Sequence, residues 1–159
     1  MNEQREVEIY TDGSFIKNKE GIKCGYGVHY PNKEYEDISK RFKIKPLTNQ
    51  RAELYAIYKG IKQVSKENEM KDIIIYSDSE YSINSITKWI KKWKINEWKT
   101  ANNKDVLNKD IIKKIDNLIL NHKGKIRFIH VKSHTGLNDY NSIHNDIVDK
   151  LAKRGSEIS

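Results

Sequence analysis

The chain has 159 residues, of which 30 are Lys or Arg and 22 are Asp or Glu, so its formal net charge is +8. This charge excludes an acidic mimic of another protein's partner, and 33% charged residues with only two prolines is not the composition of a disordered chain. Cys24 is the only cysteine, which excludes an internal disulfide and a cysteine-based zinc cluster.

Three strands are expected in the first third of the chain. Residues 7–10 alternate apolar and charged side chains and then meet Asp12-Gly13-Ser14, a pattern that predicts a strand ending in a turn. Residues 24–30 and 35–44 are the next predicted strands. Glycines and a Pro-Asn pair separate these segments, so they are expected to form an antiparallel meander.

The rest of the chain alternates helices and strands. Asn49 is the expected N-cap of a helix that runs to about residue 67, and the apolar run 73–76 predicts a buried strand. A helix from Ser79 broken near Asn96, a helix over 105–121, a strand over 126–131 and a helix over 145–154 stopped by Gly155 follow. This order predicts an α/β fold: a five-stranded mixed sheet, antiparallel in its first three strands and then parallel, with helices on both faces.

Basic residues are concentrated between Lys88 and Arg127, where 12 basic residues face only 4 acidic ones. A charge run of this kind is most often a solvated helix face. Here, however, three tryptophans alternate with the lysines, and aromatic side chains on a cationic surface favour binding to a phosphate backbone. Burial in the core remains the alternative for Trp89.

Four acidic residues lie where a solvated charge is not the natural choice. Asp12 and Asp78 follow apolar strands, whereas Glu53 and Asp149 lie within predicted helices. Ligands of open α/β sheets gather beyond the carboxyl ends of strands, and clustered carboxylates repel one another unless divalent cations neutralise them. Taken singly, each acid has a simpler explanation as a turn residue, a partner of the helix dipole or a helix cap.

Five ordered segments carry a family resemblance: YTDGS at 10–14, TNQRAEL at 48–54, YSDS at 76–79, HVKSHTG at 130–136, and residues 145–152. Together they resemble type 1 ribonuclease H over nearly the whole chain. The resemblance implies a ribonuclease H-like fold and a metal-dependent endonuclease that hydrolyses the RNA strand of RNA/DNA hybrids, leaving 5′-phosphate and 3′-hydroxyl ends. We therefore expect residues 1–159 to form one catalytic domain without a separate hybrid-binding domain.

The resemblance also implies the catalytic and metal-binding residues. Asp12, Glu53, Asp78 and Asp149 correspond to the family's metal-binding carboxylates, and His134 corresponds to its loop histidine, which assists turnover. The cofactor implied is a pair of Mg²⁺ ions, with Mn²⁺ as a substitute. Asp146 lies one helical turn before Asp149 and competes with it for the fourth ligand role. The segment between His134 and Asp149 is also longer than in familiar members.

Nucleic-acid contacts follow from the same resemblance. Asn18, Asn49 and Gln50 are expected at the RNA strand, where amide groups can recognise 2′-hydroxyls. A basic protrusion is expected to lie near the DNA strand, through Trp89, Lys91, Lys92, Trp93, Lys94, Trp98 and Lys99. Thr48 and Asn108 are expected at a pocket for a DNA phosphate, in which Pro46 replaces the arginine of some relatives.

Two other classes of function compete with a nuclease. A non-catalytic module that holds hybrids or duplexes gains nothing from carboxylates beside a phosphate, and an integrase or transposase core normally needs added domains. No apolar run approaches the roughly 18–20 residues of a membrane span, and no signal-peptide segment opens the chain. We therefore expect a monomer without membrane attachment, located inside the cell, in the cytoplasm or wherever the host replicates its DNA.

Overall fold

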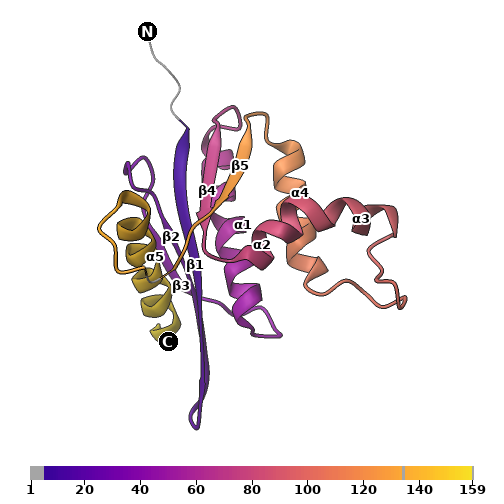
Figure 1. The fold of residues 1–159 in the computed structure, drawn as a ribbon, viewed down its shortest axis with the longest axis horizontal. Coiled ribbons are helices and arrows are strands. Elements are labelled where there is room, and N and C mark those ends of the chain that lie inside the picture. The colour runs from indigo at the N-terminus through magenta and orange to yellow at the C-terminus, as the bar shows by residue number, and fades with distance from the viewer. Residues whose placement is uncertain (1–5, 134, 159) are drawn as a thin grey trace.

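Five strands form one mixed sheet in the computed structural model, which describes residues 6–133 and 135–158 (Figure 1). The strands are β1 (Val7–Asn18), β2 (Gly21–His29), β3 (Ile38–Arg41), β4 (Ile73–Ser77) and β5 (Ile126–His130). Their order across the sheet is β3-β2-β1-β4-β5. The pairs β1–β2 and β2–β3 are antiparallel, while β1–β4 and β4–β5 are parallel, so the predicted fold class is confirmed.

Helices cover both faces of this sheet. They are α1 (Asn49–Glu67), α2 (Glu80–Asn84), the π-helical turn η1 (Ser85–Trp89), α3 (Ile90–Ile95), α4 (Lys109–Asn121) and α5 (Tyr140–Glu157). Helix α5 packs on one face against β1, β2 and β3, whereas α1 packs on the opposite face and is flanked by α4 (Figure 1). None of the helices in the described part of the chain combines the length and apolar character that crossing a membrane requires.

The main hydrophobic core lies between the sheet and α1. Leu54, Ile57 and Ile61 recur at the three- and four-residue spacing that forms one apolar helix face, and all three are fully buried. They pack in one cluster with the buried side chains of Ile9 on β1 and Ile75 on β4. Burying side chains of this size contributes about 1.5–3 kcal/mol each, so this face fixes α1 against the sheet.

The first strand is longer than the sequence predicted, and the predicted turn at Asp12-Gly13-Ser14 is wrong. Strand β1 continues through these residues to Asn18, and Gly13 pairs with Tyr26 in the antiparallel ladder with β2. A Cβ atom on Gly13 would lie only 2.6 Å from the backbone nitrogen of Glu53. The glycine therefore marks a close approach between strand and helix and not a turn.

Two predicted helix boundaries are also wrong. The N-cap of α1 is Thr48, whose side-chain oxygen accepts a hydrogen bond from the backbone N–H of Arg51, and Asn49 is the first helical residue. Gly155 does not stop α5, which runs from Tyr140 to Glu157. A Cβ atom on Gly155 would lie 2.5 Å from the carbonyl oxygen of Lys40, so this glycine lets the helix touch β3.

Three further elements begin or end at other residues than the sequence predicted. Strand β2 begins earlier than predicted, and β3 covers only Ile38–Arg41 of the predicted residues 35–44. Helix α4 begins at Lys109 and not at Asp105, because Asn108 has a φ of 63°, which an α-helix does not allow. The predicted break near Asn96 is confirmed, since α3 ends at Ile95.

Replacement of Gly25 tests the contact between α5 and the sheet. A Cβ atom at this position would lie 2.2 Å from the backbone nitrogen of Ser156, so Gly25→Ala must displace the helix. Such overpacking costs about 1–3 kcal/mol, which urea unfolding would detect.

Gly60→Ala is the matched control, because its Cβ atom would meet side chains and no backbone, Ile9 at 3.1 Å and Val28 at 3.4 Å. Alanine is favoured over glycine inside a helix by about 1 kcal/mol, so the net change at Gly60 should be small. Equal loss of stability in both variants would contradict the steric argument.

Candidate metal centre and nucleic-acid interface

Asp12 and Asp78 are neighbours because the strands that carry them are parallel and in register. Thr11 of β1 is paired with Ser77 at the end of β4. The next residue on each chain is an aspartate, so the two carboxylates emerge side by side at the carboxyl edge of β4. This is the edge at which open α/β sheets collect ligands.

Glu53 is added to this pair by the contact between β1 and the first turns of α1. Ligand oxygens of Asp12, Glu53 and Asp78 all lie within 4.8 Å of one another. The backbone N–H of Gly13 donates to Asp12 Oδ1 at 2.9 Å and to Glu53 Oε1 at 2.8 Å. One backbone group thus positions two carboxylates.

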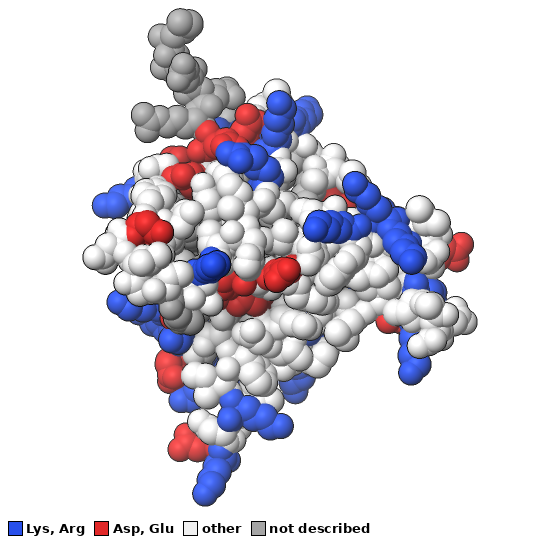
Figure 2. All heavy atoms as spheres, in the orientation of Figure 1, with Lys and Arg blue, Asp and Glu red and all other residues white. Residues whose placement is uncertain are grey.

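A cleft of about 310 Å³ surrounds these acids and is lined by Asp12, Gly13, Asn49, Glu53, Asp78, Ser79, Ser133 and Asp149. The space-filling view shows a compact group of acidic atoms near the middle of this face (Figure 2). All four predicted carboxylates therefore line a single opening. Among them, the side chains of Asp12 and Glu53 are buried, with 3% and 5% exposure.

Burial makes the negative charge in the cleft costly. The pKa of Asp12 is raised well above its ordinary value, chiefly by burial and next by the nearby charge of Glu53. The pKa of Glu53 is raised as well, again chiefly by burial, although the hydrogen bonds from Asp12 and Gly13 oppose the shift. Without a cation, the cleft therefore favours protonated carboxyl groups.

The donor set fits a hard divalent cation. Carboxylate oxygens are the ligands that Mg²⁺ and Ca²⁺ prefer, and the cleft provides no described sulfur or imidazole donor. Glu53 Oε2 is buried and has no hydrogen-bond partner in the described structure. A buried oxygen without a partner loses the free energy of a hydrogen bond, and a cation in the cleft restores an interaction to it.

Asp149 and not Asp146 reaches the cleft. Asp149 lies on α5, lines the opening, and contributes to the raised pKa of Asp12. It also forms an ion pair with Lys153, one turn further along the helix, at 3.0 Å. Asp146 is exposed and does not line the opening. The geometry thus separates the two candidates for the fourth ligand.

The model of the RNase H family matches residues 4–157. The chain belongs to this family. Probable ribonuclease H of Acanthamoeba polyphaga mimivirus is 37% identical over 139 residues, which are 86% of this chain and 60% of that protein. Ribonuclease H of Haemophilus influenzae is 38% identical over 157 residues, which are 97% of this chain and 92% of that protein.

A solved structure of the same family agrees with this assignment. The solution structure of the RNase H domain of prototype foamy virus superposes with a TM-score of 0.73 and 29% identity, covering 98% of this chain and 96% of that one. The chain spans only 60% of the length of its mimivirus relative, so that protein as a whole extends beyond the shared RNase H region.

The other residues predicted from the family motifs are distributed unevenly. His134 lies outside the described residues. Asn49 lines the cleft, and Gln50 follows it on α1 with an exposed side chain. Asn18 lies at the far end of β1, about 20 Å along the strand from Asp12 at about 3.3 Å per residue. Its side chain accepts a hydrogen bond from the backbone N–H of Glu20 in the hairpin turn.

Thr48 and Asn108 are joined through Arg51, a residue that the sequence analysis did not single out. Arg51 is 3% exposed; its guanidinium donates to Asn108 Oδ1 at 3.3 Å and to both carboxylate oxygens of Asp110 at 2.8 and 2.7 Å. Asn108 in turn donates to the hydroxyl of Tyr81. The only signal in the sequence for this role of Arg51 was its position inside the TNQRAEL segment.

The predicted protrusion consists of α3 and the loop that follows it, and it projects from the body of the molecule (Figure 1). Lys91 and Lys92 are exposed and form no ion pair within residues 6–133 and 135–158. Two other predicted lysines are already engaged in ion pairs: Lys94 with Asp116 at 2.8 Å and Lys99 with Asp105 at 2.7 Å. Lys91 and Lys92 are therefore the lysines best placed to meet a phosphate.

The three tryptophans form an aromatic ladder along this protrusion. The ring centroids of Trp89 and Trp93 are 6.0 Å apart, and those of Trp93 and Trp98 are 6.1 Å apart. Trp93 and Trp98 pack against the hydrophobic core, whereas Trp89 is 41% exposed. Trp89 is therefore not buried in the core, which was the alternative for this residue. The ladder packs along the protrusion and stabilises it.

Stability without metal should depend on pH through the buried acids. Because Asp12 and Glu53 have raised pKa values in the folded state, their contribution is full below about pH 4, where such groups titrate in an unfolded chain. This contribution to the free energy of unfolding is lost progressively as pH rises from there toward and through the raised pKa values, so the loss continues above neutrality. Asp12→Asn removes the free-energy cost of keeping this buried carboxyl protonated at pH 8 and should raise the Tm in EDTA at that pH by at least about 3 °C, which corresponds to about 1 kcal/mol.

Thermal unfolding of both proteins in EDTA at pH 5 and pH 8 checks this expectation. The difference in Tm between the variant and the original chain should grow with pH, and Mg²⁺ should raise the Tm of the original chain only. An equal difference in Tm at pH 5 and pH 8 would show that the carboxyl groups of the cleft do not destabilise the folded state.

Proposed function

We propose that this chain is a Mg²⁺-dependent endonuclease that hydrolyses the RNA strand of RNA/DNA hybrids and leaves 5′-phosphate and 3′-hydroxyl ends. The observation that carries the proposal is the convergence of Asp12, Glu53, Asp78 and Asp149 on one cleft in a member of the RNase H family. A protein that only bound nucleic acid would lose affinity by placing buried carboxylates beside a phosphate.

In this proposal Asp12, Glu53, Asp78 and Asp149 would together hold the divalent ions. When bound, two Mg²⁺ ions supply a nucleophilic water and stabilise the charge that develops on the phosphoryl group and on the leaving 3′ oxygen. Asp78 and Asp149 lie beside Asp12 on adjoining elements, and Glu53 completes the set from α1. The partnerless oxygen of Glu53 supports this assignment.

The neighbouring residues then orient the substrate. Asn49 and Gln50 would hydrogen-bond 2′-hydroxyls of the RNA strand, because an amide both donates and accepts. Lys91 and Lys92 on the protrusion would meet phosphates of the DNA strand. His134, which the family motif singles out, is proposed to move a proton or to assist product release.

Cleavage of three labelled duplexes tests the proposal. With Mg²⁺, the chain should cut the RNA strand of an RNA/DNA hybrid and leave duplex DNA and duplex RNA intact, and EDTA should abolish cutting. Mapping of the product ends should give 5′-phosphates. An intact hybrid, or equal cutting of all three duplexes, would refute the proposed function.

Substitution of single carboxylates tests the assignment of the site. Asp78→Asn and Asp12→Asn should each lower the cleavage rate by at least about a thousandfold, because several kcal/mol of charge stabilisation depend on the ions they hold. Asp146→Asn is the matched control: it removes the same charge one helical turn from Asp149 but outside the cleft. Comparable losses in all three variants would contradict the assignment.

A further inference from the structure

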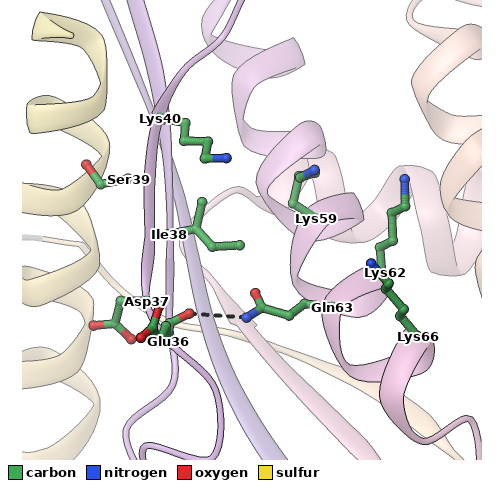
Figure 3. Close-up of a pocket in the computed structure, with 9 residues that line it drawn as sticks. All are labelled: Glu36, Asp37, Ile38, Ser39, Lys40, Lys59, Lys62, Gln63 and Lys66. Carbon is green, nitrogen blue, oxygen red and sulfur yellow. Dashed lines mark hydrogen bonds between the residues drawn. The ribbon is translucent and has the colours of Figure 1, made fainter.

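A second groove, larger than the carboxylate cleft, lies between β3 and the outer side of α1 (Figure 3). Its volume is about 540 Å³. Strand β3 contributes Ile38 and Lys40, and helix α1 contributes Lys59, Lys62, Gln63 and Lys66. The side chain of Lys40 extends from the strand toward Lys59 on the helix, so cationic groups stand on both walls (Figure 3).

These lysines are not neutralised by neighbouring acids. Lys40, Lys59, Lys62 and Lys66 form no ion pair within the described part of the chain. The pKa of Lys59 is lowered, chiefly by burial and next by the charges of Lys62 and Lys40. Cations that repel one another in this way are stabilised by an anion that enters between them.

The acidic residues that line the groove, Glu36 and Asp37, form no ion pair with these lysines in the described part of the chain. The Asp37 carboxylate hydrogen-bonds to His29 at 2.8 Å and accepts from the backbone N–H of Tyr30 at 2.8 Å. Glu36 contributes its backbone carbonyl, which accepts a hydrogen bond from Gln63. With the Asp37 carboxylate engaged in this way, the other charged side chains that line the groove are Glu36 and four lysines, so positive charge predominates.

The groove is separate from the carboxylate cleft. With 3.6 residues per turn, Lys59, Lys62 and Lys66 are rotated by about 180–240° from Glu53 around the axis of α1. They also lie about 9–20 Å further along that axis, at about 1.5 Å per residue. Because Glu53 faces the cleft, these lysines face away from it. The groove therefore faces away from a duplex seated on the carboxylates.

Aromatic rings adjoin the lysines. The ring of Tyr58 on α1 has the ammonium groups of Lys62 and of Lys114 on α4 at 5.4 and 5.9 Å from its centroid. The ring of Tyr55 lies 5.5 Å from that of Tyr58. Both rings are partly buried and pack against the hydrophobic core beside the groove. Lysines beside aromatic side chains are typical of surfaces that bind single-stranded nucleic acids, with phosphates at the cations.

We propose that this lysine groove binds a segment of single-stranded nucleic acid, separately from the hybrid in the carboxylate cleft. Lys59 and Lys66 are seven residues apart, about 10 Å along the helix, so a single phosphate ion would meet only some of the lysines of α1. A strand with a charge at every nucleotide can meet them all. The inference shares with the proposed function only the premise that nucleic acid is the partner, and it needs no hydrolysis.

Fluorescence anisotropy with a labelled single-stranded oligothymidylate, measured in EDTA so that no cleavage occurs, tests the proposal. The variant combines Lys59→Gln, Lys62→Gln and Lys66→Gln. We expect its Kd to rise about tenfold and the slope of log K against log salt to fall by about 2, since each phosphate contact on a single strand contributes about 0.7. A double variant, Lys62→Gln with Lys66→Gln, should show about two thirds of the change in slope and leaves the partly buried Lys59 in place.

The matched control removes the same charge elsewhere, through Lys71→Gln, Lys123→Gln and Lys125→Gln near the amino ends of β4 and β5. It should bind the oligothymidylate as the original chain does. Equal weakening in the control, or unchanged affinity in both groove variants, would overturn the proposal. In Mg²⁺, the groove variants should cleave a short blunt hybrid within about twofold of the original rate; a larger loss would place these lysines at the hybrid, which also overturns it.

Discussion

The arrangement of the carboxylate cleft depends on overcoming the mutual repulsion between its buried carboxylates. Parallel pairing of β1 with β4 brings Asp12 beside Asp78, and the close approach of α1 at Gly13 brings Glu53 to the same point. Each contact is held by groups outside the cleft, namely the strand ladder and the apolar face of α1. The hydrophobic core therefore supplies the free energy that keeps like charges together, and a divalent cation is the partner that offsets their repulsion.

Positive charge is arranged in two places around this negative centre. The protrusion carries the exposed Lys91 and Lys92 together with an aromatic ladder. The lysine groove lies on the side of α1 that faces away from Glu53. The carboxylates would repel a phosphate backbone in the absence of a cation, whereas the proposed binding surfaces would attract it, most strongly at low salt. Binding and metal loading are thus assigned to separate parts of the molecule.

The sequence predicted the fold class and the convergence of carboxylates because both depend on patterns that are local or ordered along the chain. Apolar periodicity identified each helix and strand, and Asp78 directly follows an apolar strand. The errors arose where a distant contact decides the local structure. Asp12-Gly13 has the composition of a turn, but packing on Glu53 makes it strand; Gly155 resembles a helix stop, but contact with Lys40 keeps it in α5.

Arg51 shows a second limit. Its partners Asn108 and Asp110 are 57 and 59 residues away, and no local pattern indicates that a charged side chain between Gln50 and Ala52 is buried. The sequence assigned Asp149 over Asp146 only through its family resemblance; the physical reason, the rotation of their common helix against the sheet, is visible only in the structure. Such features require the tertiary arrangement.

The glycines at the contact between α5 and the sheet affect how tightly the cleft can hold a cation. Asp149 stands on a helix whose backbone touches β2 and β3 directly, at Gly25, Gly27 and Gly155. The depth at which this carboxylate enters the cleft is therefore set by three positions that bear no charge and contact no ion. Any side chain there acts as a spacer, so the strength with which the molecule chelates a cation is a property of its steric fit as well as of its acids.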